Sequence, residues 1–476
     1  MEQKMLINGK FVDASDGKVL QSINPYNGEV IGTYPAATHE DIETALDAAV
    51  AGQKVWASMS VNQRNAVLLK AADLFDAHAA ELAELQTREM GMPILISRGE
   101  GASAGPVFRS CVAAATHTLG SVYPNKDAAG GLGDLAISIT DPLGVVACIG
   151  PFNFPVSCLT YKTAPALTMG NAIIIKAPSD VSLLILRYAE ILNEAGFPDG
   201  VVQAVSGSGS VIGDWLTDTP KINAIGFTGS TATGSHLMSI AAKHFHRVTL
   251  EMGGNDAIII TEDADLEQAV AQSMSRMFNA GQVCCATKRF LIQNSRKEEY
   301  LSMLVSMVSS LKLGDPSDPT TAMGPVVNEN AAINVESQIQ HTIAQGARLL
   351  CGGERNGAFI TPCVLECTKD MDVASNLEIF GPVWSVIGFD TVEEAIEIVN
   401  QSRYGLNGGV MAGTLQQGIS IASKIQSGTV VCNGAGGWRR DIAPFGGYKQ
   451  SGIGREGVLE LLKEYSQVKT LVINGV

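Results

Sequence analysis

Gly144-Val145-Val146-Ala147-Cys148-Ile149 is a short run of small and apolar residues, and the turn-forming residue Pro151 follows it closely. Similar runs lie at residues 172–175, 222–227 and 257–260, with helical segments between them. Short apolar runs bounded by turn residues predict β-strands. Strands that are apolar at every position predict a parallel sheet with helices on both faces. The stretch therefore predicts an α/β fold.

The segments on either side of these runs carry helix start signals. Thr38 and Asp41 form a capping-box pattern, and apolar residues recur at helical spacing after it. A second α/β series follows Glu251; it comprises helices that begin near Asp265 and Lys297, a capping box at Thr391 and Glu394, and a strand at residues 429–432. Two such series predict two α/β lobes, and the cleft between lobes is a usual place for a ligand.

Composition excludes several classes of partner. The chain has 476 residues, 46% of them hydrophobic, and a formal net charge of -15. An acidic chain without a basic tract is not expected to bind nucleic acid or anionic membranes. Nine cysteines without Cys-x-x-Cys pairs, and no apolar amino-terminal run, indicate a reduced, cytoplasmic protein. His244 and His246 have no ligand cluster beside them, so we interpret them as a histidine pair on a strand and expect no metal.

Three segments carry residue types suited to chemistry on a carbonyl group. Residues 279–286, with the sequence NAGQVCCA, present the thiol of Cys284 in a glycine-led turn. Taken alone, such a cysteine is more often a buried small apolar side chain than a nucleophile. Glu251 is a lone carboxylate before two glycines and is a candidate general base. Asn153 stands between Pro151 and Pro155, which orient its amide as a candidate oxyanion donor.

Together with three further motifs, these segments resemble the aldehyde dehydrogenase superfamily. The further motifs are residues 227–231 (FTGST), 378–382 (EIFGP) and 444–447 (PFGG), and the resemblance runs from residue 7 to residue 456. One motif alone arises easily by chance, whereas six in the family's order identify the chain as a member. The resemblance implies oxidation of an aldehyde to a carboxylic acid with NAD or NADP.

The resemblance also assigns roles to the three candidate residues. Cys284 follows the Gly-Gln-x signature and is expected to be the nucleophile that forms a thioester. Glu251 is expected to activate the water that hydrolyses this thioester. Asn153, with the backbone N–H of Cys284, is expected to hold the oxyanion, and Cys285 is expected to line the pocket.

The cofactor site is predicted from weaker patterns. Residues 229–234 (GSTATG) fit any turn into a helix, but after a strand they place a helix amino terminus where a pyrophosphate binds. The residues expected to contact the cofactor are Lys176, Ser179, Gly229, Ser230, Gly234, Glu378, Phe380 and Phe152. Lys176 and Glu378 match the family's contacts to the two riboses, although a lysine at a strand end is usually solvated. Ser179 stands where many NAD-preferring relatives carry a glutamate, which predicts that NADP is accepted despite neighbouring Asp180.

The substrate pocket is predicted to be apolar or aromatic. Tyr161 occupies the position at which relatives specific for succinate semialdehyde carry an arginine. The predicted pocket residues are Phe154, Tyr161, Val283, Cys285, Trp438 and Arg439. They favour a neutral aliphatic or aromatic aldehyde. Arg439 and Arg440 keep an anionic semialdehyde open as the alternative. A CoA-acylating enzyme is a further alternative, but its members usually lack the base, and a binding protein without activity is disfavoured by the intact candidate residues.

The resemblance implies two Rossmann-like lobes with a small β element for oligomerisation. We expect a dinucleotide-binding domain at residues 1–120 and 143–250 and a catalytic domain at residues 251–448. Residues 121–142, as a hairpin, and 449–476, with a strand at 467–473, are expected to form the oligomerisation element. A homodimer or homotetramer is therefore expected, although the last segment alternates poorly and fits a plain surface strand as well.

Overall fold

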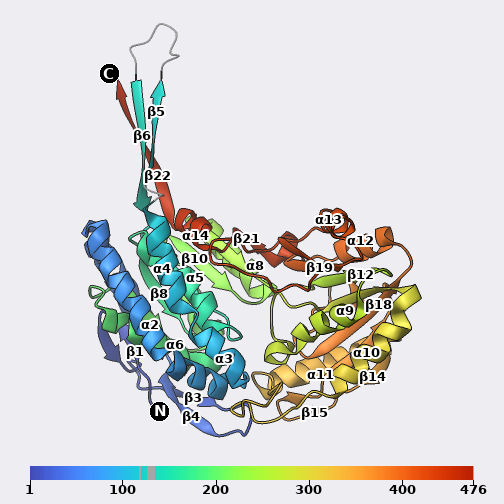
Figure 1. Cartoon of the computed structure of the whole chain (residues 1–476). Coiled ribbons are helices and arrows are strands. Elements are labelled where there is room, and N and C mark those ends of the chain that lie inside the picture. Colours follow the sequence, from blue (N-terminus) through green and yellow to red (C-terminus); the bar gives the residue numbers. More distant parts are fainter. Residues whose placement is uncertain (117–119, 126–133, 475–476) are drawn as a thin grey trace.

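The computed structural model describes residues 1–116, 120–125 and 134–474, and two large sheets organise them (Figure 1). The first sheet has the order β2-β1-β9-β8-β7-β10-β11-β21. Its strands are β1 (Met5–Ile7), β2 (Lys10–Val12), β7 (Val145–Ile149), β8 (Ala172–Lys176), β9 (Val202–Val205), β10 (Ala224–Thr228), β11 (Arg247–Glu251) and β21 (Gly452–Ile453). The five strands from β9 to β11 are mutually parallel, and the flanking strands are antiparallel.

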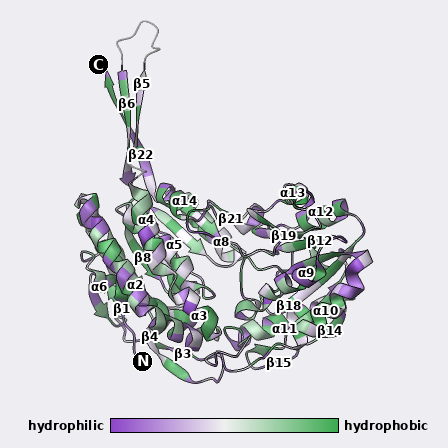
Figure 2. Ribbon diagram, viewed as in Figure 1, coloured by the Kyte–Doolittle hydropathy of each residue, from purple (hydrophilic) through white to green (hydrophobic). Residues whose placement is uncertain are grey.

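Helices cover both faces of this first sheet. One face packs on α1 (His39–Ser58), α7 (Gly209–Thr217) and α8 (Thr231–His244). The other face packs on α5 (Pro155–Thr168), α6 (Ser182–Ala195) and α14 (Val458–Glu464), with α2 (Val61–Met90), α3 (Ile94–Gly101) and α4 (Ala104–Ala115) outside them. In Figure 2, hydrophilic and hydrophobic residues are interspersed along α2, as expected for a helix with one solvent face. The predicted capping box of Thr38 and Asp41 starts α1.

The second sheet has the order β14-β17-β18-β13-β12-β19-β20. Its strands are β12 (Ala257–Ile260), β13 (Arg289–Gln293), β14 (Arg348–Cys351), β17 (Cys363–Cys367), β18 (Val383–Phe389), β19 (Asn407–Met411) and β20 (Thr429–Cys432). All pairs are parallel except β14 with β17. The covering helices are α9 (Leu266–Ser273) and α10 (Lys297–Ser309) on one face, and α11 (Glu329–Ala344), α12 (Val392–Asn400) and α13 (Leu415–Ala422) on the other. The predicted α/β class with two parallel-sheet lobes is confirmed.

A three-stranded antiparallel sheet projects from the first lobe (Figure 1). It pairs β22 (Ser466–Asn474) with β6 (Asp134–Pro142), and β6 with β5 (Gly120–Asn125). Residues 126–133 of the predicted hairpin, together with 117–119 and 475–476, lie outside the described residues. We call the sheet of β5, β6 and β22 the blade. From the segment 449–476, only β22 joins the blade, because β21 pairs with β11 and α14 packs on α5. Two small hairpins complete the strands: β3 (Val19–Ile23) with β4 (Val30–Pro35), and β15 (Arg355–Asn356) with β16 (Phe359–Ile360).

Two local predictions were wrong in detail. His244 and His246 are not on a strand: His244 is the last residue of α8, Phe245 adopts a left-handed conformation, and His246 precedes β11. The histidine pair itself is present, because the two rings stack with their centroids 5.1 Å apart, and His244 also contacts Asp218 at 2.7 Å. Thr391 caps α12 as predicted, but the Glu394 carboxylate accepts from the backbone N–H of Asp390, so the box is not closed on Thr391. Among the described helices, none is long and apolar enough to span a bilayer.

Parallel pairing brings the predicted site segments to one edge of the first sheet. Lys176 and Phe227 both lie opposite Ile149, and Thr228 lies opposite Glu251. These residues are at the carboxyl ends of their strands. Ligands of open α/β sheets bind outside the carboxyl ends of the strands. The fold therefore gathers residues far apart in sequence at the expected place for a site.

Candidate active site

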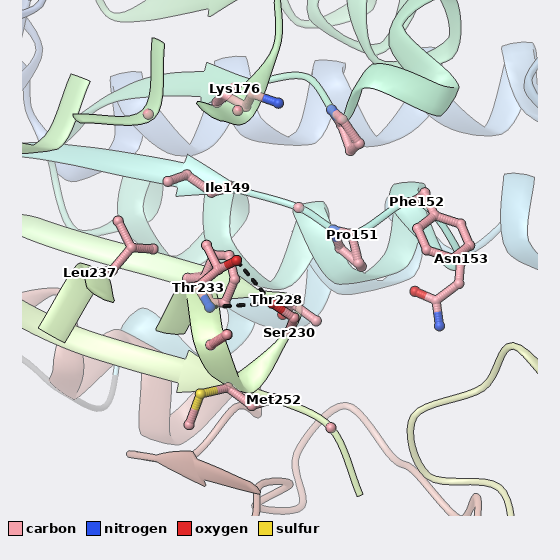
Figure 3. A pocket seen from close by; sticks show the side chains of 18 of the residues that line it. Ile149, Pro151, Phe152, Asn153, Lys176, Thr228, Ser230, Thr233, Leu237 and Met252 are labelled. Atoms are coloured by element: carbon pink, nitrogen blue, oxygen red, sulfur yellow. Dashed lines mark hydrogen bonds between the residues drawn. The ribbon is translucent and has the colours of Figure 1, made fainter. Parts of the chain in front are cut away.

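A cavity of about 880 Å³ lies along this edge of the first sheet (Figure 3). Its wall includes Asn153 and Cys284 together with seven of the eight predicted cofactor residues: Phe152, Lys176, Ser179, Gly229, Ser230, Glu378 and Phe380. This size is in the range of sites that enclose small ligands and cofactors. The predicted nucleophile and the predicted cofactor residues therefore border one space.

The loop that carries Cys284 has an unusual backbone. Asn279, Ala280 and Gly281 have φ angles of 49°, 49° and 75°, three consecutive residues in the left-handed region. Glycine is required at 281, because a side chain there would overlap the backbone of Gly381. Strained backbone of this kind persists where the surrounding structure holds it, often at functional sites. Cys284 is half-buried at the end of this turn.

The two adjacent thiols influence each other. A hydrogen bond with Cys285 raises the pKa of Cys284, burial raises it further, and the ammonium of Lys288 opposes both effects. The same hydrogen bond lowers the pKa of Cys285. The protonation of one thiol therefore depends on that of the other.

Asn153 is buried between the cavity and the Cys284 loop. Its side-chain Nδ2 donates to the carbonyl oxygen of Gln282 at 2.8 Å. In return, Nδ2 of Asn279 donates to the carbonyl oxygen of Asn153 at 3.1 Å. The amide predicted to donate to an oxyanion is thus fixed directly against the backbone of the nucleophile loop.

Glu251 ends β11 and is 4% exposed, and neither carboxylate oxygen has a hydrogen-bond partner in the described part of the chain. Burial raises its pKa well above the usual value, and the neighbouring Glu456 adds to this rise, while Arg439 and Lys162 oppose it. Gly446 packs so close to Oε1 that a side chain there would overlap it. A buried carboxylate without partners is costly in a protein interior unless it has a role.

An ion-pair network lies beside Glu251. Oε1 of Glu456 is 2.6 Å from Nζ of Lys162, and its Oε2 is 2.7 Å from Nη2 of Arg439. Burial alone raises the pKa of Glu456, but the two cations bring it below its ordinary value. Two cations and two carboxylates, counting Glu251, are therefore collected in this part of the site.

The residues of the cavity fit a dinucleotide. Ser230 caps α8 by accepting from the N–H of Thr233 at 3.2 Å. Ala232 and Thr233, in the first turn of this helix, border the cavity (Figure 3). Helix amino termini favour phosphate groups. Lys176 also borders the cavity, and burial lowers its pKa to about 8. Elsewhere in the cavity wall, the rings of Phe152 and Phe380 pack edge to face, with their centroids 6.1 Å apart.

Eight predicted residues do not border this cavity, and one of them is the predicted base Glu251. Gly234 packs against the Sδ of Met252, where a side chain would overlap it, so its function is close packing of α8 on the sheet. The six predicted substrate-pocket residues, Phe154, Tyr161, Val283, Cys285, Trp438 and Arg439, are also absent from its wall. Trp438 is 44% exposed and lies under Arg440, whereas Tyr161 is buried and donates to Asp441 at 2.8 Å.

The family model for the aldehyde dehydrogenase family matches residues 11–471. The chain belongs to the aldehyde dehydrogenase family. It is similar to a solved aldehyde dehydrogenase variant from Bacillus cereus, with 36% identity, coverage of 100% of this chain and 97% of that one, and a TM-score of 0.96. An NADP-dependent enzyme from E. coli shares 33% identity over 99% and 98% of the two chains, with a TM-score of 0.95. A betaine aldehyde dehydrogenase from Staphylococcus aureus in complex with NAD+ shares 34% identity over 99% and 95%, also with a TM-score of 0.95.

This aldehyde dehydrogenase contains site residues that sequence reasoning did not single out. Lys162 is a charged residue inside the otherwise uncharged helix α5, and Lys288 directly precedes the buried strand β13. Both are buried. A charge inside an apolar segment is the signal that marks them, because lysine is almost never fully buried without a partner.

Proposed function

We propose that this NAD(P)-dependent aldehyde dehydrogenase oxidises a neutral aliphatic or aromatic aldehyde to the free acid through a thioester on Cys284. The observation that carries the proposal is the position of Cys284 and Asn153 in the wall of the cavity that also contains Lys176, Ser230 and Glu378. A thiol, an amide donor and the cofactor residues thus face one space. Oxidation of an aldehyde needs these three elements together.

The first half of the reaction uses Cys284 and Asn153. The thiolate adds to the aldehyde carbon, a C–S bond forms, and the carbonyl π electrons move to oxygen. Nδ2 of Asn153 and the backbone N–H of Cys284 hold this oxyanion. Bound NAD(P)+ supplies the acceptor for the hydride that leaves when the carbonyl re-forms. The product on the enzyme is a thioester of Cys284.

The second half uses Glu251. Its carboxylate takes a proton from water, the hydroxide adds to the thioester carbon, and the C–S bond breaks to return the thiolate. Within the described residues, both Glu251 oxygens are free of hydrogen-bond partners, which leaves them open to a water and supports this role. Burial also raises the pKa of Glu251 well above its usual value, which makes this carboxylate a stronger base than an exposed glutamate.

The cofactor is held by the residues of the cavity. Lys176 and Ser179 are proposed to contact the adenosine ribose, the first turn of α8 after Gly229 and Ser230 the phosphates, and Glu378 the nicotinamide ribose. A serine at 179 places no carboxylate against a ribose 2′-phosphate. NADP is therefore proposed as an accepted cofactor beside NAD.

The charge balance of the site supports a neutral substrate. Arg439 and Arg440 were the residues that kept an anionic substrate open. The guanidinium of Arg439 is paired with Glu456 and stacked on Tyr161 and Phe445, and that of Arg440 lies over the exposed ring of Trp438. Lys162 and Arg439 together balance Glu456 and an ionised Glu251. No surplus positive charge is left in this network for the distal carboxylate of succinate semialdehyde.

Two further properties complete the proposal. Nine free cysteines in the described residues, with a reactive thiol among them, support a reducing compartment such as the cytoplasm. The blade formed by β5, β6 and β22 exposes Val122, Tyr123, Val468 and Val472, which supports assembly as a homodimer or homotetramer through this blade. Exposed apolar strands are rarely left uncovered in a soluble monomer.

The test compares products and cofactors. Purified enzyme is mixed with hexanal or benzaldehyde and with NAD or NADP, in the presence and absence of CoA. The expected products are the free acid and reduced cofactor, at rates that CoA does not change. Formation of acyl-CoA in place of the acid would establish the CoA-acylating alternative, and no reduction of cofactor with any aldehyde would remove the proposal.

A further inference from the structure

Lys288 is a buried lysine at the base of the nucleophile loop. Its side chain is 2% exposed, and its position directly before β13 fixes its backbone. Nζ donates to three carbonyl oxygens of the loop: that of Cys284 at 2.6 Å, and those of Val283 and Ala286 at 3.3 Å each. These carbonyl oxygens gather around an ammonium group that has three N–H donors. One side chain thus holds the backbone on both sides of Cys284.

The same nitrogen reaches the cofactor side of the site. Nζ of Lys288 is 3.4 Å from Oε1 of Glu378, and this oxygen also accepts from the N–H of Gly254 at 3.2 Å. Glu378 borders the cavity, and its other oxygen faces Gly253, where a side chain would overlap it. Oε1 is therefore occupied by the protein, while Oε2 lies in the space that the missing side chain leaves.

Lys288 is also a cation close to the predicted thiolate. The groups that face Cys284 and carry or can acquire charge are Cys285, Lys288, Asp256, Glu251 and Cys158. Of these, Lys288 alone is positive and favours the thiolate of Cys284. Asp256 interacts with both Lys288 and Cys284, and burial raises its pKa to about 7, so its negative charge is partly suppressed at neutral pH. The charge of Lys288 is therefore available to the loop.

We propose that Lys288 is a positioning residue that ties the Cys284 loop to the cofactor-binding carboxylate of Glu378. The inference rests on the proposed function of both residues. A single buried ammonium fixes the nucleophile relative to the ribose, and its charge supports the thiolate. Cofactor affinity and thiol reactivity therefore depend on the same side chain, although Lys288 itself touches neither the substrate nor the reacting atoms.

The test uses three variants at one position and two measurements that need no turnover. Lys288→Arg keeps the charge, Lys288→Gln keeps two N–H donors without charge, and Lys288→Met removes both. The rate of Cys284 alkylation by iodoacetamide is followed from pH 6 to pH 10, with the modified residue identified by mass spectrometry. The dissociation constants of NAD and NADP are measured by quenching of tryptophan fluorescence.

Loss of the charge is expected to shift the alkylation profile of Lys288→Gln and Lys288→Met to higher pH and slow alkylation at pH 7.5 by about tenfold. Lys288→Arg is expected to retain most of the wild-type rate. Cofactor binding is expected to weaken by roughly fivefold to tenfold in the uncharged variants, the usual scale for loss of one charge-assisted contact. In combination with Glu378→Gln, Lys288→Gln is expected to add little further loss, because both changes remove the same link.

The proposed link between Lys288 and Glu378 is wrong if the double variant weakens cofactor binding by the sum of the free-energy losses of the two single variants. An unshifted alkylation profile in Lys288→Gln overturns the thiolate part. Far-UV circular dichroism identifies variants that do not fold, and if Lys288→Met is one of them, the contrast between Arg and Gln still decides. Failure of the proposed function is distinct, because it appears in the wild type as an enzyme that reduces no cofactor with any aldehyde.

Discussion

Nδ2 of Asn153 donates to the carbonyl oxygen of Gln282 at 2.8 Å, two residues before Cys284. An amide group has two N–H donors, and this bond uses one of them. The second is available to a substrate oxygen in the cavity that Asn153 and Cys284 share. The bond therefore fixes the distance between the predicted oxyanion donor and the predicted nucleophile before any substrate arrives.

Asn153→Ala is expected to slow thioester formation by about two to three orders of magnitude, because one preorganised donor to the oxyanion is lost. Stopped-flow absorbance of the first turnover of reduced cofactor measures this step. Cofactor affinity serves as the internal control and is expected to stay within about twofold, since the amide contacts the loop and not the phosphates. A first turnover within tenfold of wild type would contradict the assignment.

Cys284→Ala is expected to abolish dehydrogenase and esterase activity while cofactor binding persists. Cys285→Ala, the matched control, is expected to keep substantial turnover. Because the hydrogen bond with Cys285 raises the pKa of Cys284, its removal is expected to shift alkylation of Cys284 to lower pH. Iodoacetamide kinetics from pH 6 to pH 10 test this shift. An inactive Cys285→Ala variant would show that Cys285, and not Cys284, is the nucleophile.

Glu251→Gln is expected to produce one equivalent of reduced cofactor and then stall as the acyl-enzyme, which mass spectrometry detects on Cys284. The base acts only when ionised, and burial raises its pKa well above the usual value. In the wild type, hydrolysis of the acyl-enzyme is therefore expected to slow as pH falls through this raised pKa, while thioester formation follows Cys284. Steady turnover in Glu251→Gln would assign the base elsewhere.

The sequence was sufficient for elements whose signals are local. The predicted strand at residues 257–260 matches β12 without error, and those at 144–149, 172–175 and 222–227 differ from β7, β8 and β10 by at most two residues at either end. Uniform apolarity marks such strands because both faces are buried. The prediction that His244 and His246 lie on a strand was wrong, because alternation over three residues is too short to separate a strand from a helix end.

The partners in the site could not be predicted in the same way. Glu456 pairs with Lys162, 294 residues earlier in the chain, and with Arg439, and nothing local in these segments specifies the contacts. Lys288 likewise reaches Glu378 only because β13 and β18 are adjacent strands that bring their flanking loops together. Contacts of this kind depend on strand order, which local patterns leave open.

Lys176 is expected to make NADP affinity depend on pH. Burial lowers its pKa to about 8, so the free enzyme carries the charge below pH 8 and loses it as pH rises through this value. The dissociation constant of NADP is expected to increase above pH 8, and that of NAD to increase less, because the 2′-phosphate is the more strongly charged group. Lys176→Met is expected to flatten both profiles, whereas equal profiles for both cofactors in the wild type would place the phosphate elsewhere.

The proposed substrate preference rests on the surroundings of Arg439. Its guanidinium carbon lies 3.8 Å from the centre of the Tyr161 ring and 4.6 Å from that of Phe445, and its Nη2 pairs with Oε2 of Glu456. We therefore expect kcat/KM to be higher for hexanal and benzaldehyde than for glycolaldehyde or succinate semialdehyde.

Arg439→Ala leaves Glu456 with one cation instead of two beside Glu251, so it is expected to lower activity with all four aldehydes to a similar extent. Arg440→Ala is the matched control, because Arg440 lies over the exposed Trp438 and makes no ion pair among the described residues. A strong preference for succinate semialdehyde that collapses selectively in Arg439→Ala would show that this arginine binds the substrate carboxylate and would overturn the neutral assignment.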